Sequence, residues 1–400
     1  MQYRNNPKNG DRLSLLGLGC MRFPNKGLKV DEQAGIAIIQ QALASGVNYF
    51  DTAYVYHNGF SEGILGKALA DGARDRVKIA TKMPHYLVRS YHDLERIFKT
   101  QLQRLQTDHI DYYLMHMLSD VGIWRKLEEL GIKQWVQQRK AAGEIINFGF
   151  SFHGRADNFL ALLAEYPWDF CQLQYNYLDE NNQAGRSGLQ QAAKQGLPVI
   201  IMEPLRGGKL IDGIGQQAQQ LIKDKGKSPA ELGLAWVYDQ PEVTVVLSGM
   251  SSCQQVIDNA LLTDQVPAGS LDATAKQLIN EVKSLIQSQQ WIPCSSCRYC
   301  LPCPQGVDIP GCFAAYNDKH VMKTKSSWMF YMQSTGAFTA EGGNAGKCVG
   351  CGLCKKHCPQ NIDIPEQLKL VKKELENPLF QIVRVITKLI MGKKAKKKAA

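Results

Sequence analysis

The clustering of cysteines is the feature that most constrains this chain. Of its 12 cysteines, nine lie between Cys294 and Cys358, and the other three are scattered over the first 290 residues. The N-terminal segment MQYRNNPKNGDR is polar and has no apolar signal-peptide core. In a chain without an export signal, such dense clustering favours metal binding over disulfides. We therefore expect a metal-binding region after about residue 290 and an intracellular, cytoplasmic protein.

The cysteine region is an internal duplication. The run CSSCRYCLPCPQGVDIP begins at Cys294, and the run CVGCGLCKKHCPQNIDIP begins at Cys348. Three thiolates at x₂ intervals can bind three adjacent corners of a cubane cluster, while the fourth ligand arrives from elsewhere. Structural zinc is the alternative, but zinc sites generally use two CxxC-type pairs separated by a loop. The duplication therefore predicts two [4Fe-4S] clusters.

This region resembles two-cluster ferredoxins, in which the cysteine before the proline ligates the other cluster. The resemblance implies two crossed ligand sets: Cys294, Cys297, Cys300 and Cys358 for one cluster, and Cys348, Cys351, Cys354 and Cys303 for the other. The first run ends in x₂-CP instead of the usual x₃-CP, which leaves open whether the crossing is strict. Cys312 is expected to be a buried thiol outside both sets.

The first 290 residues alternate short apolar runs with helical patterns. Helices are expected at 32–46, at 90–105 and after Ser228-Pro229. Eight such strands indicate a parallel sheet, and their number together with the absence of an early GxGxxG favours a closed barrel over an open sheet. The predicted strands are residues 14–19, 47–51, 77–82, 110–116, 146–151, 170–174, 198–203 and 243–249. We therefore predict an α/β fold, a (β/α)₈ TIM barrel followed by a small α-helical ferredoxin-like domain.

We divide the chain into a barrel (1–290), a dicluster 4Fe-4S domain (291–375) and a terminal segment (376–400). The terminal segment holds PLFQIVRVITKLIM and then GKKAKKKAA, whose five lysines contribute much of the net charge of +10. One face of an amphipathic helix would collect Leu379, Ile382, Val383, Ile386, Leu389 and Ile390, opposite Arg384 and Lys388.

Three roles are open to this terminal helix: contact with an anionic membrane, docking of a partner, and packing on the chain's own body, which is the commonest. The lysine run itself is expected to be a solvated tail. No apolar run approaches the ~20 residues that cross a membrane. Beyond this charge, the sequence has no nucleic-acid motif, so we expect neither a transmembrane segment nor a nucleic-acid partner.

Reactive side chains recur at the carboxyl ends of the predicted strands, where barrel enzymes place catalysis. The second strand ends in FDTAYVYH, the third in ATKMP and the fourth in YLMH. In their order, these motifs resemble the aldo-keto reductase family over roughly residues 11–265. The family's DTAxxY element falls on the segment from Asp51 to Tyr56, its lysine on Lys82 and its histidine on His116.

The chemistry of carbonyl reduction fits these residue types. A hydride donor and a proton donor must act together, and free tyrosine is a reluctant acid with a pKa near 10. A neighbouring lysine cation stabilises tyrosinate, and an aspartate keeps that lysine charged and oriented. We therefore predict Tyr56 as proton donor, Lys82 and Asp51 as the groups that tune it, and His116 as the residue that positions substrate. Tyr54 competes with Tyr56, but the family spacing favours Tyr56.

The resemblance also implies a nicotinamide cofactor, NADP or NAD. Ser151 and Gln172 should contact its amide, although Phe152 stands where the family usually has Asn. The loop over the pyrophosphate is expected at Glu203, Pro204, Leu205, Arg206, Gly207 and Gly208. The adenosine-binding segment is expected to contribute Gly249, Met250, Gln255 and Asn259. Relatives that bind a 2′-phosphate usually carry Lys or Arg in this segment, so NADH stays an open alternative.

Three functions are compatible with these features. The first, which we favour, is a reductase of small-molecule carbonyls whose clusters link it to a flavoprotein or ferredoxin. The second is an electron-transfer protein that uses the barrel as a nicotinamide-binding scaffold, and the third is a reductase with structural clusters. A hydride carries two electrons whereas each cluster takes one, and a flavin normally joins these regimes. We find no flavin motif and no loop pattern that specifies a substrate.

Overall fold

The computed structural model describes residues 1–27, 29–289, 291–294, 296–321, 327–337, 342–358 and 360–392, the side chains of 386–392 excepted. Eight parallel strands close into a barrel in which each strand pairs with the next and the last pairs with the first. The strands are β3 (Leu16–Gly19), β6 (Tyr49–Asp51), β7 (Lys78–Met83), β8 (Ile110–Leu118), β9 (Ile145–Phe152), β10 (Phe170–Gln174), β11 (Val199–Met202) and β12 (Val243–Ser248). The predicted TIM barrel is thereby confirmed, with every strand at its predicted place.

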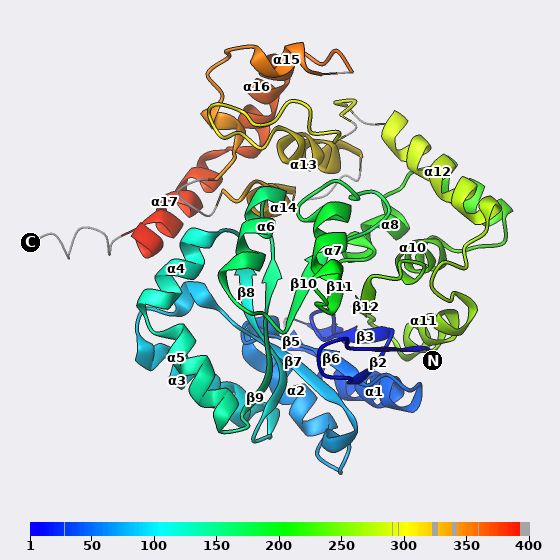
Figure 1. Cartoon of the computed structure of the whole chain (residues 1–400). Coiled ribbons are helices and arrows are strands. Elements are labelled where there is room, and N and C mark those ends of the chain that lie inside the picture. The colour runs from blue at the N-terminus through cyan, green and yellow to red at the C-terminus, as the bar shows by residue number, and fades with distance from the viewer. Residues whose placement is uncertain are drawn as a thin grey trace, which may run out of the picture.

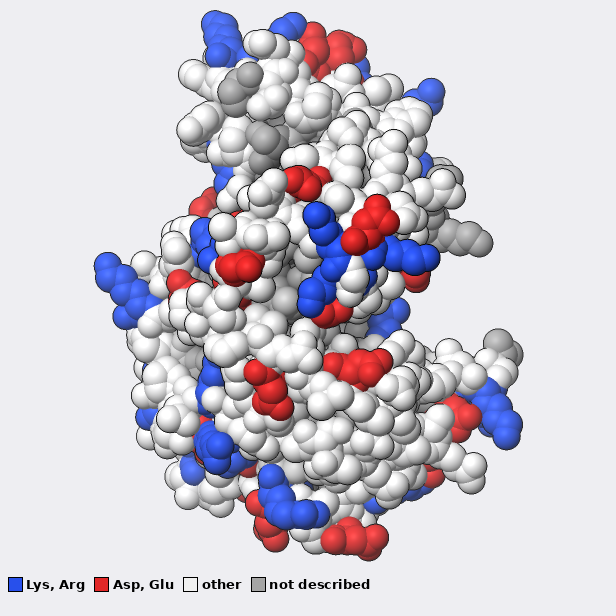
Figure 2. Space-filling model, turned by 90° about the vertical axis from the view of Figure 1, so that its right-hand side faces the viewer, with Lys and Arg blue, Asp and Glu red and all other residues white. Residues whose placement is uncertain are grey.

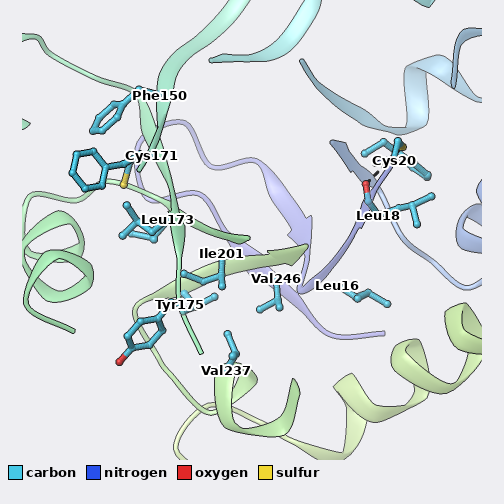
Figure 3. Close-up of a cluster of buried hydrophobic side chains, with 14 of the residues drawn as sticks. Leu16, Leu18, Cys20, Phe150, Cys171, Leu173, Tyr175, Ile201, Val237 and Val246 are labelled. Carbon is cyan, nitrogen blue, oxygen red and sulfur yellow. Dashed lines mark hydrogen bonds between the residues drawn. The ribbon is translucent and has the colours of Figure 1, made fainter. Parts of the chain in front are cut away.

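Helices surround the barrel and bury the outer face of the strands (Figure 1). Figure 3 shows part of this layer, where Ile201 and Val246 on the strands lie near Val237 of α10. Ser228 begins α10 with a reciprocal capping box to Glu231, as its sequence predicts. The helices are α1 (Glu32–Ala44), α2 (Phe60–Ala68), α3 (Tyr91–Leu105), α4 (Val121–Glu129), α5 (Ile132–Ala141), α6 (Ala156–Glu165), α7 (Gly185–Lys194), α8 (Lys209–Asp212), α9 (Gln216–Asp224), α10 (Pro229–Tyr238), α11 (Cys253–Gln265) and α12 (Ala273–Ser288).

A short antiparallel hairpin covers the end of the barrel at which the strands begin. Its strands are β1 (Tyr3–Asn5) and β2 (Arg12–Ser14). The Tyr112 hydroxyl near the start of β8 donates to Asp11 at 2.8 Å and accepts from Asn6 at 3.0 Å. A second two-stranded sheet, β4 (Asn25–Lys26) and β5 (Lys29–Val30), follows β3. Neither hairpin is predicted from the sequence.

A second hydrophobic core holds the cysteine-rich region together. The first core extends to Ile286 on α12, and the second begins at Ile292. Phe380 is fully buried in the second core, so α17 packs on this region. Its helices are α13 (Ile309–Val321), α14 (Ser327–Thr335), α15 (Leu353–Lys356), α16 (Ile364–Leu375) and α17 (Pro378–Gly392).

The cysteine-rich domain sits over the barrel end at which the strands finish, with α13 and α14 nearest the barrel (Figure 1). Arg155, just after β9, donates to the carbonyl of Gly306 at 3.4 Å. Arg298 donates to the carbonyl of Asn181, in the loop after β10, at 3.2 Å. The second domain therefore contacts the loops that in a TIM barrel carry function.

The terminal helix α17 leaves apolar side chains in solvent. Leu379, Ile382 and Val385 are each more than half exposed, whereas Val383 packs against the second core. The lysine run at 393–400 and the side chains of Ile386, Leu389 and Ile390 lie outside the described residues. Among the helices searched in the described part of the chain, none has the length and apolarity to cross a membrane. On the face that Figure 2 shows, acidic and basic residues are interspersed.

Candidate active site

A buried ion pair occupies the carboxyl ends of two neighbouring strands. Lys82 on β7 donates to Asp51 Oδ1 on β6 at 2.6 Å and to the carbonyl of Thr52 at 2.7 Å. Lys82 is 1% exposed and Asp51 is 3% exposed. Burial alone would lower the pKa of Lys82, but the charges of Asp51 and Tyr56 outweigh burial and raise it. The lysine is therefore held as a cation.

Tyr56 lies directly beside this pair. The Lys82 Nζ atom is 4.8 Å from the centroid of the Tyr56 ring, and the His116 ring centroid is 6.0 Å from it. Burial raises the pKa of Tyr56 above its usual value, and the charge of Lys82 opposes that rise. Lys82 thus lowers the pKa of Tyr56, but burial raises that pKa by more. The next two residues, His57 and Asn58, have left-handed φ values of 50° and 56° and turn the chain into α2.

Tyr54 is held away from Lys82. The Arg104 guanidinium lies 4.5 Å from the centroid of the Tyr54 ring and donates to the Tyr54 carbonyl at 3.1 Å. Arg104 also pairs with the buried carboxylate of Glu62 at 3.1 Å. The two tyrosines thus have different neighbours. Tyr56 lies beside Lys82, whereas Tyr54 lies beside the ion pair of Arg104 and Glu62.

His116 lies beside Tyr56, and His85 and His153 lie near His116. Burial, then the charge of Lys82, lowers the pKa of His116 well below its usual value, so the ring is neutral. Its Nδ1 atom is buried and has no hydrogen-bond partner among the described residues. Burial also lowers the pKa of His85, to about 4, and that of His153. A neutral imidazole with a free nitrogen can bind a polar group of a small molecule.

The residues expected at the nicotinamide amide line the same end of the barrel. The Ser151 hydroxyl accepts from the backbone N–H of Met117 at 2.9 Å. Gln172 is 1% exposed, and its Oε1 atom has no partner within the described chain. A buried orphan acceptor is costly, and a ligand amide would satisfy it. The residues present therefore fit a nicotinamide. Phe152, which replaces the family's Asn, is buried against Phe159.

The segment expected over the pyrophosphate forms a tight loop after β11. Glu203 and Arg206 adopt left-handed φ values of 55° and 49°. Arg206 is 6% exposed and pairs through Nε with Asp179 at 3.0 Å. Pro204 is buried, Leu205 is partly buried and Gly207 is exposed. The Arg206 side chain therefore faces the protein interior.

The expected adenosine-binding segment begins α11. Gln255 is exposed, and its Oε1 atom accepts from the backbone N–H of Ser251 at 2.8 Å. Met250 is buried, and Asn259 donates to the Ser248 hydroxyl at 3.3 Å. Gly249 follows β12 directly.

Arg22 lies between the loop after β11 and the segment that begins at Gly249, and it was not predicted from the sequence. A Cβ at Gly249 would lie 2.6 Å from Arg22 Cγ, and a Cβ at Gly207 would lie 2.5 Å from Arg22 Nη2. The two glycines thus let the arginine lie between the segments. Arg22 is exposed, whereas Phe23 beside it is buried and stacks on His57. Its position just after the first strand, in LGLGCMR, was the signal in the sequence.

Six of the eight predicted cluster cysteines pack against the second core, whereas Cys297 and Cys351 are exposed. Cys294, Cys297, Cys300 and Cys358 line one cavity together with Phe313 and Ile362. The thiols of Cys303 and Cys348 are close enough to Cys354 to add to the rise that burial causes in its pKa. The fold therefore places Cys358 with the first cysteine run and Cys303 near Cys348 and Cys354. Within the described residues, no group of three or more His, Cys, Asp or Glu side chains lies close enough together to hold a single metal ion.

Cys312 differs from these eight thiols. It is fully buried, and its Sγ atom lies 3.5 Å from the carbonyl oxygen of Gly343. Burial raises its pKa far above the usual value, so it stays a protonated thiol. This environment matches the expectation of a buried thiol outside both ligand sets.

Comparison with known proteins agrees with both parts of the molecule. The model of the aldo/keto reductase family matches residues 15–266, and a 4Fe-4S dicluster domain matches residues 293–362. An uncharacterized oxidoreductase of Bacillus subtilis, YrpG, is 28% identical over 332 residues, which cover 70% of this chain and 96% of that protein. L-galactose dehydrogenase of Arabidopsis thaliana is 25% identical and covers 70% of this chain and 92% of that protein.

Solved structures share the barrel. The holo form of the aldo-keto reductase AKR11C1 from Bacillus halodurans superimposes with a TM-score of 0.59 at 25% identity, covering 70% of this chain and 96% of that one. An aldo-keto reductase from Klebsiella pneumoniae, solved with NADPH, has a TM-score of 0.59 at 23% identity and covers 71% and 96% of the two chains. With its barrel, its site and a family match over most of its length, this chain belongs to the aldo/keto reductase family and is an NAD(P)-dependent oxidoreductase with a C-terminal 4Fe-4S domain.

Proposed function

We propose that this protein reduces the carbonyl group of a small molecule, with Tyr56 as the proton donor. The observation that carries the proposal is the convergence of Tyr56, the buried Lys82–Asp51 pair and a neutral His116 at the ends of three adjacent strands. When bound, the nicotinamide cofactor supplies the hydride. The Tyr56 hydroxyl gives its proton to the developing alkoxide, and the Lys82 cation stabilises the tyrosinate left behind. His116 orients the carbonyl through its unpartnered nitrogen.

The cofactor is NADP or NAD, held by Ser151 and Gln172 at the amide and by the segments from Glu203 and from Gly249. The NADPH complex of the Klebsiella pneumoniae relative supports NADPH. The lack of a basic residue at Gly249, Met250 or Gln255 supports NADH instead. Oxidation of NADH and of NADPH against a panel of aldehydes and ketones, with anaerobically purified protein, tests both points. Absence of carbonyl-dependent oxidation with either cofactor would overturn the proposal.

The cysteine-rich domain binds two [4Fe-4S] clusters in this proposal, through the crossed sets Cys294/Cys297/Cys300/Cys358 and Cys348/Cys351/Cys354/Cys303. The clusters link the barrel to a redox partner, a flavoprotein or a ferredoxin. A hydride carries two electrons, whereas a cluster takes one. A flavin on that partner would convert between two-electron and one-electron transfer. Carbonyl turnover that is equal with the clusters reduced and oxidised, but falls when they are removed, would favour a structural role for them.

We expect anaerobically purified protein to contain about eight irons per chain, because two four-iron clusters fill both cysteine sets. Iron and sulfide analysis together with the electron paramagnetic resonance spectrum of the reduced protein measure this directly. The Cys312→Ala variant is the matched control, since a thiol outside both sets should not change the iron content. Four irons per chain, or tight zinc with no iron after reconstitution, would contradict the two-cluster proposal.

Replacement of Arg22 by glutamine should weaken cofactor binding about tenfold or more, because a charged hydrogen bond to a phosphate contributes ~1.5–3 kcal/mol. Fluorescence titration with NADH and with NADPH measures the effect. Equal losses for both cofactors would place Arg22 at the pyrophosphate, and a loss for NADPH alone would place it at the 2′-phosphate. Arg125→Gln, at an exposed ion pair on α4, is the control. Unchanged affinity for both cofactors in Arg22→Gln would remove Arg22 from the site.

A further inference from the structure

The loop after β11 has a strained backbone. Four of its six residues adopt left-handed φ values, and two of these, Glu203 and Arg206, are not glycine. A non-glycine residue in this region is strained, and such conformations persist only where the surrounding structure holds them. The loop therefore needs contacts that fix it, and its own glycines, Gly207 and Gly208, cannot supply any through side chains.

The Arg206 side chain makes those contacts. Its guanidinium pairs with Asp179 at 3.0 Å on one side and with Asp318 at 3.3 Å on another. Its Cζ atom also lies 4.8 Å from the centroid of the Phe330 ring. Asp179 belongs to the barrel, where Gln174 donates to the same carboxylate at 2.8 Å. Asp318 and Phe330 come from the cysteine-rich domain.

Asp318 contacts two residues in the second half of this loop, Arg206 and Lys209. Its side chain is fully buried, and Oδ2 accepts from Lys209 at 2.8 Å while Oδ1 faces Arg206. From the barrel, Asp179 pairs directly with the Arg206 guanidinium, and the charge of Glu203 also acts on it. A buried cation that loses an acidic partner is destabilised by several kcal/mol. The carboxylate of Asp318 is therefore part of what keeps this loop in place.

Helix α13 ties the same residue to the cysteine site. Asn317, the neighbour of Asp318, accepts from the N–H of Ile292 at 2.9 Å and donates to the Ile292 carbonyl at 2.7 Å. Ile292 leads directly into Cys294. One turn of α13 thus holds the start of the first cysteine run and the barrel loop at once, so the position of Asp318 is fixed from its own domain.

We propose that Asp318 is a positioning residue of the barrel's cofactor site: a carboxylate of the cysteine-rich domain holds the Glu203–Lys209 loop in the conformation that receives the cofactor. This inference rests on the proposed function, which places the pyrophosphate at that loop. It makes the barrel's cofactor site incomplete without the second domain. Asp318 contacts neither cofactor nor substrate and acts through Arg206 and Lys209.

The test compares full-length, iron-loaded wild type, Asp318→Asn and Asp318→Glu. We expect Asp318→Asn to weaken NADPH or NADH binding by about 5- to 150-fold, the usual range for coupled sites. Iron content and the cluster spectrum should stay unchanged. Asp318→Glu keeps the charge but moves it by one methylene, so its cofactor affinity should lie between those of wild type and Asp318→Asn. Hydrogen exchange of the amides at 203–209 should speed up in the same order, and this readout does not require cofactor.

Arg155→Gln is the matched control, because it removes a different contact between the domains, to Gly306, and should leave both readouts unchanged. Equal affinity and equal loop exchange in Asp318→Asn and wild type would overturn the inference. If Asp318→Asn fails to hold its iron, the comparison of Asp318→Glu with wild type decides in the same way. A wild type that binds neither nicotinamide would contradict the proposed function, while the exchange at 203–209 would still show whether Asp318 holds the loop.

Discussion

Tyr56→Phe should lower carbonyl turnover by about 10²–10⁴-fold, the usual contribution of general acid catalysis. The substitution keeps the ring beside Lys82 and His116 and deletes the hydroxyl that we propose protonates the alkoxide. Cofactor affinity should stay within about twofold of wild type, because the expected cofactor contacts lie on other strands and a twofold change is under 0.5 kcal/mol. Steady-state turnover with the best carbonyl of the panel and fluorescence titration of the cofactor measure the two quantities.

Tyr54→Phe is the control for this variant. Its ring packs under Arg104, away from Lys82, so its hydroxyl should contribute little to turnover. Normal turnover by Tyr56→Phe would end the reductase proposal and favour the barrel as a nicotinamide-binding scaffold. A collapse confined to Tyr54→Phe would move the proton donor by two residues. The pair of variants therefore separates the identity of the acid from the identity of the reaction.

The barrel could be predicted because local and global signals agree in it. Each strand is a short apolar run, and each is followed by a helical pattern with its own start, such as Ser228-Pro229 before α10. The N-terminal hairpin was not predictable, because β1 and β2 have three residues each and owe their stability to contacts such as that between Asp11 and Tyr112. Such strands have too little sequence for a period-2 pattern to be recognised.

The candidate site also has a part that could be predicted from the sequence and a part that could not. Asp51, Lys82 and His116 lie near the carboxyl ends of successive strands, Tyr56 follows the first of these strands, and the structure brings the four together. Arg206 was expected near the cofactor as a member of its loop. The sequence could not reveal that its side chain turns to Asp318, because that partner lies 112 positions later in the chain. Long-range ion pairs of this kind leave no local pattern, and the same holds for Arg22 between two glycines.

Lys82→Met should cost both turnover and about 3–5 kcal/mol of stability, because it leaves the buried Asp51 carboxylate without its cation. Turnover should fall by about as much as in Tyr56→Phe, since no charge then stabilises the tyrosinate. Urea unfolding under anaerobic conditions measures the stability of the variant, and steady-state kinetics measures its turnover. Wild-type stability in Lys82→Met would show that solvent reaches Asp51 and that the pair is not the buried unit described here.

The stability loss of Lys82→Met should also depend on pH in a defined direction. Burial raises the pKa of Asp51, and Lys82 opposes that rise, so the rise is unopposed in the variant. When the pKa of a carboxyl is higher in the folded state than its unfolded value of ~3.9, the folded protein binds the proton more tightly than the unfolded protein does. The stability lost in Lys82→Met relative to wild type is therefore largest above the raised pKa of Asp51. It shrinks as the pH falls toward ~3.9.

The double variant Asp51→Asn/Lys82→Met separates the two effects of the pair. A neutral amide beside a thioether leaves no uncompensated buried charge, so most of the lost stability should return. Turnover should not return, because the cation that acts on Tyr56 is still absent. Recovery of stability without turnover would show that Lys82 serves the reaction through its charge on Tyr56. Recovery of both would mean that Lys82→Met impairs turnover only by disturbing the fold, and the assignment of Lys82 would fail.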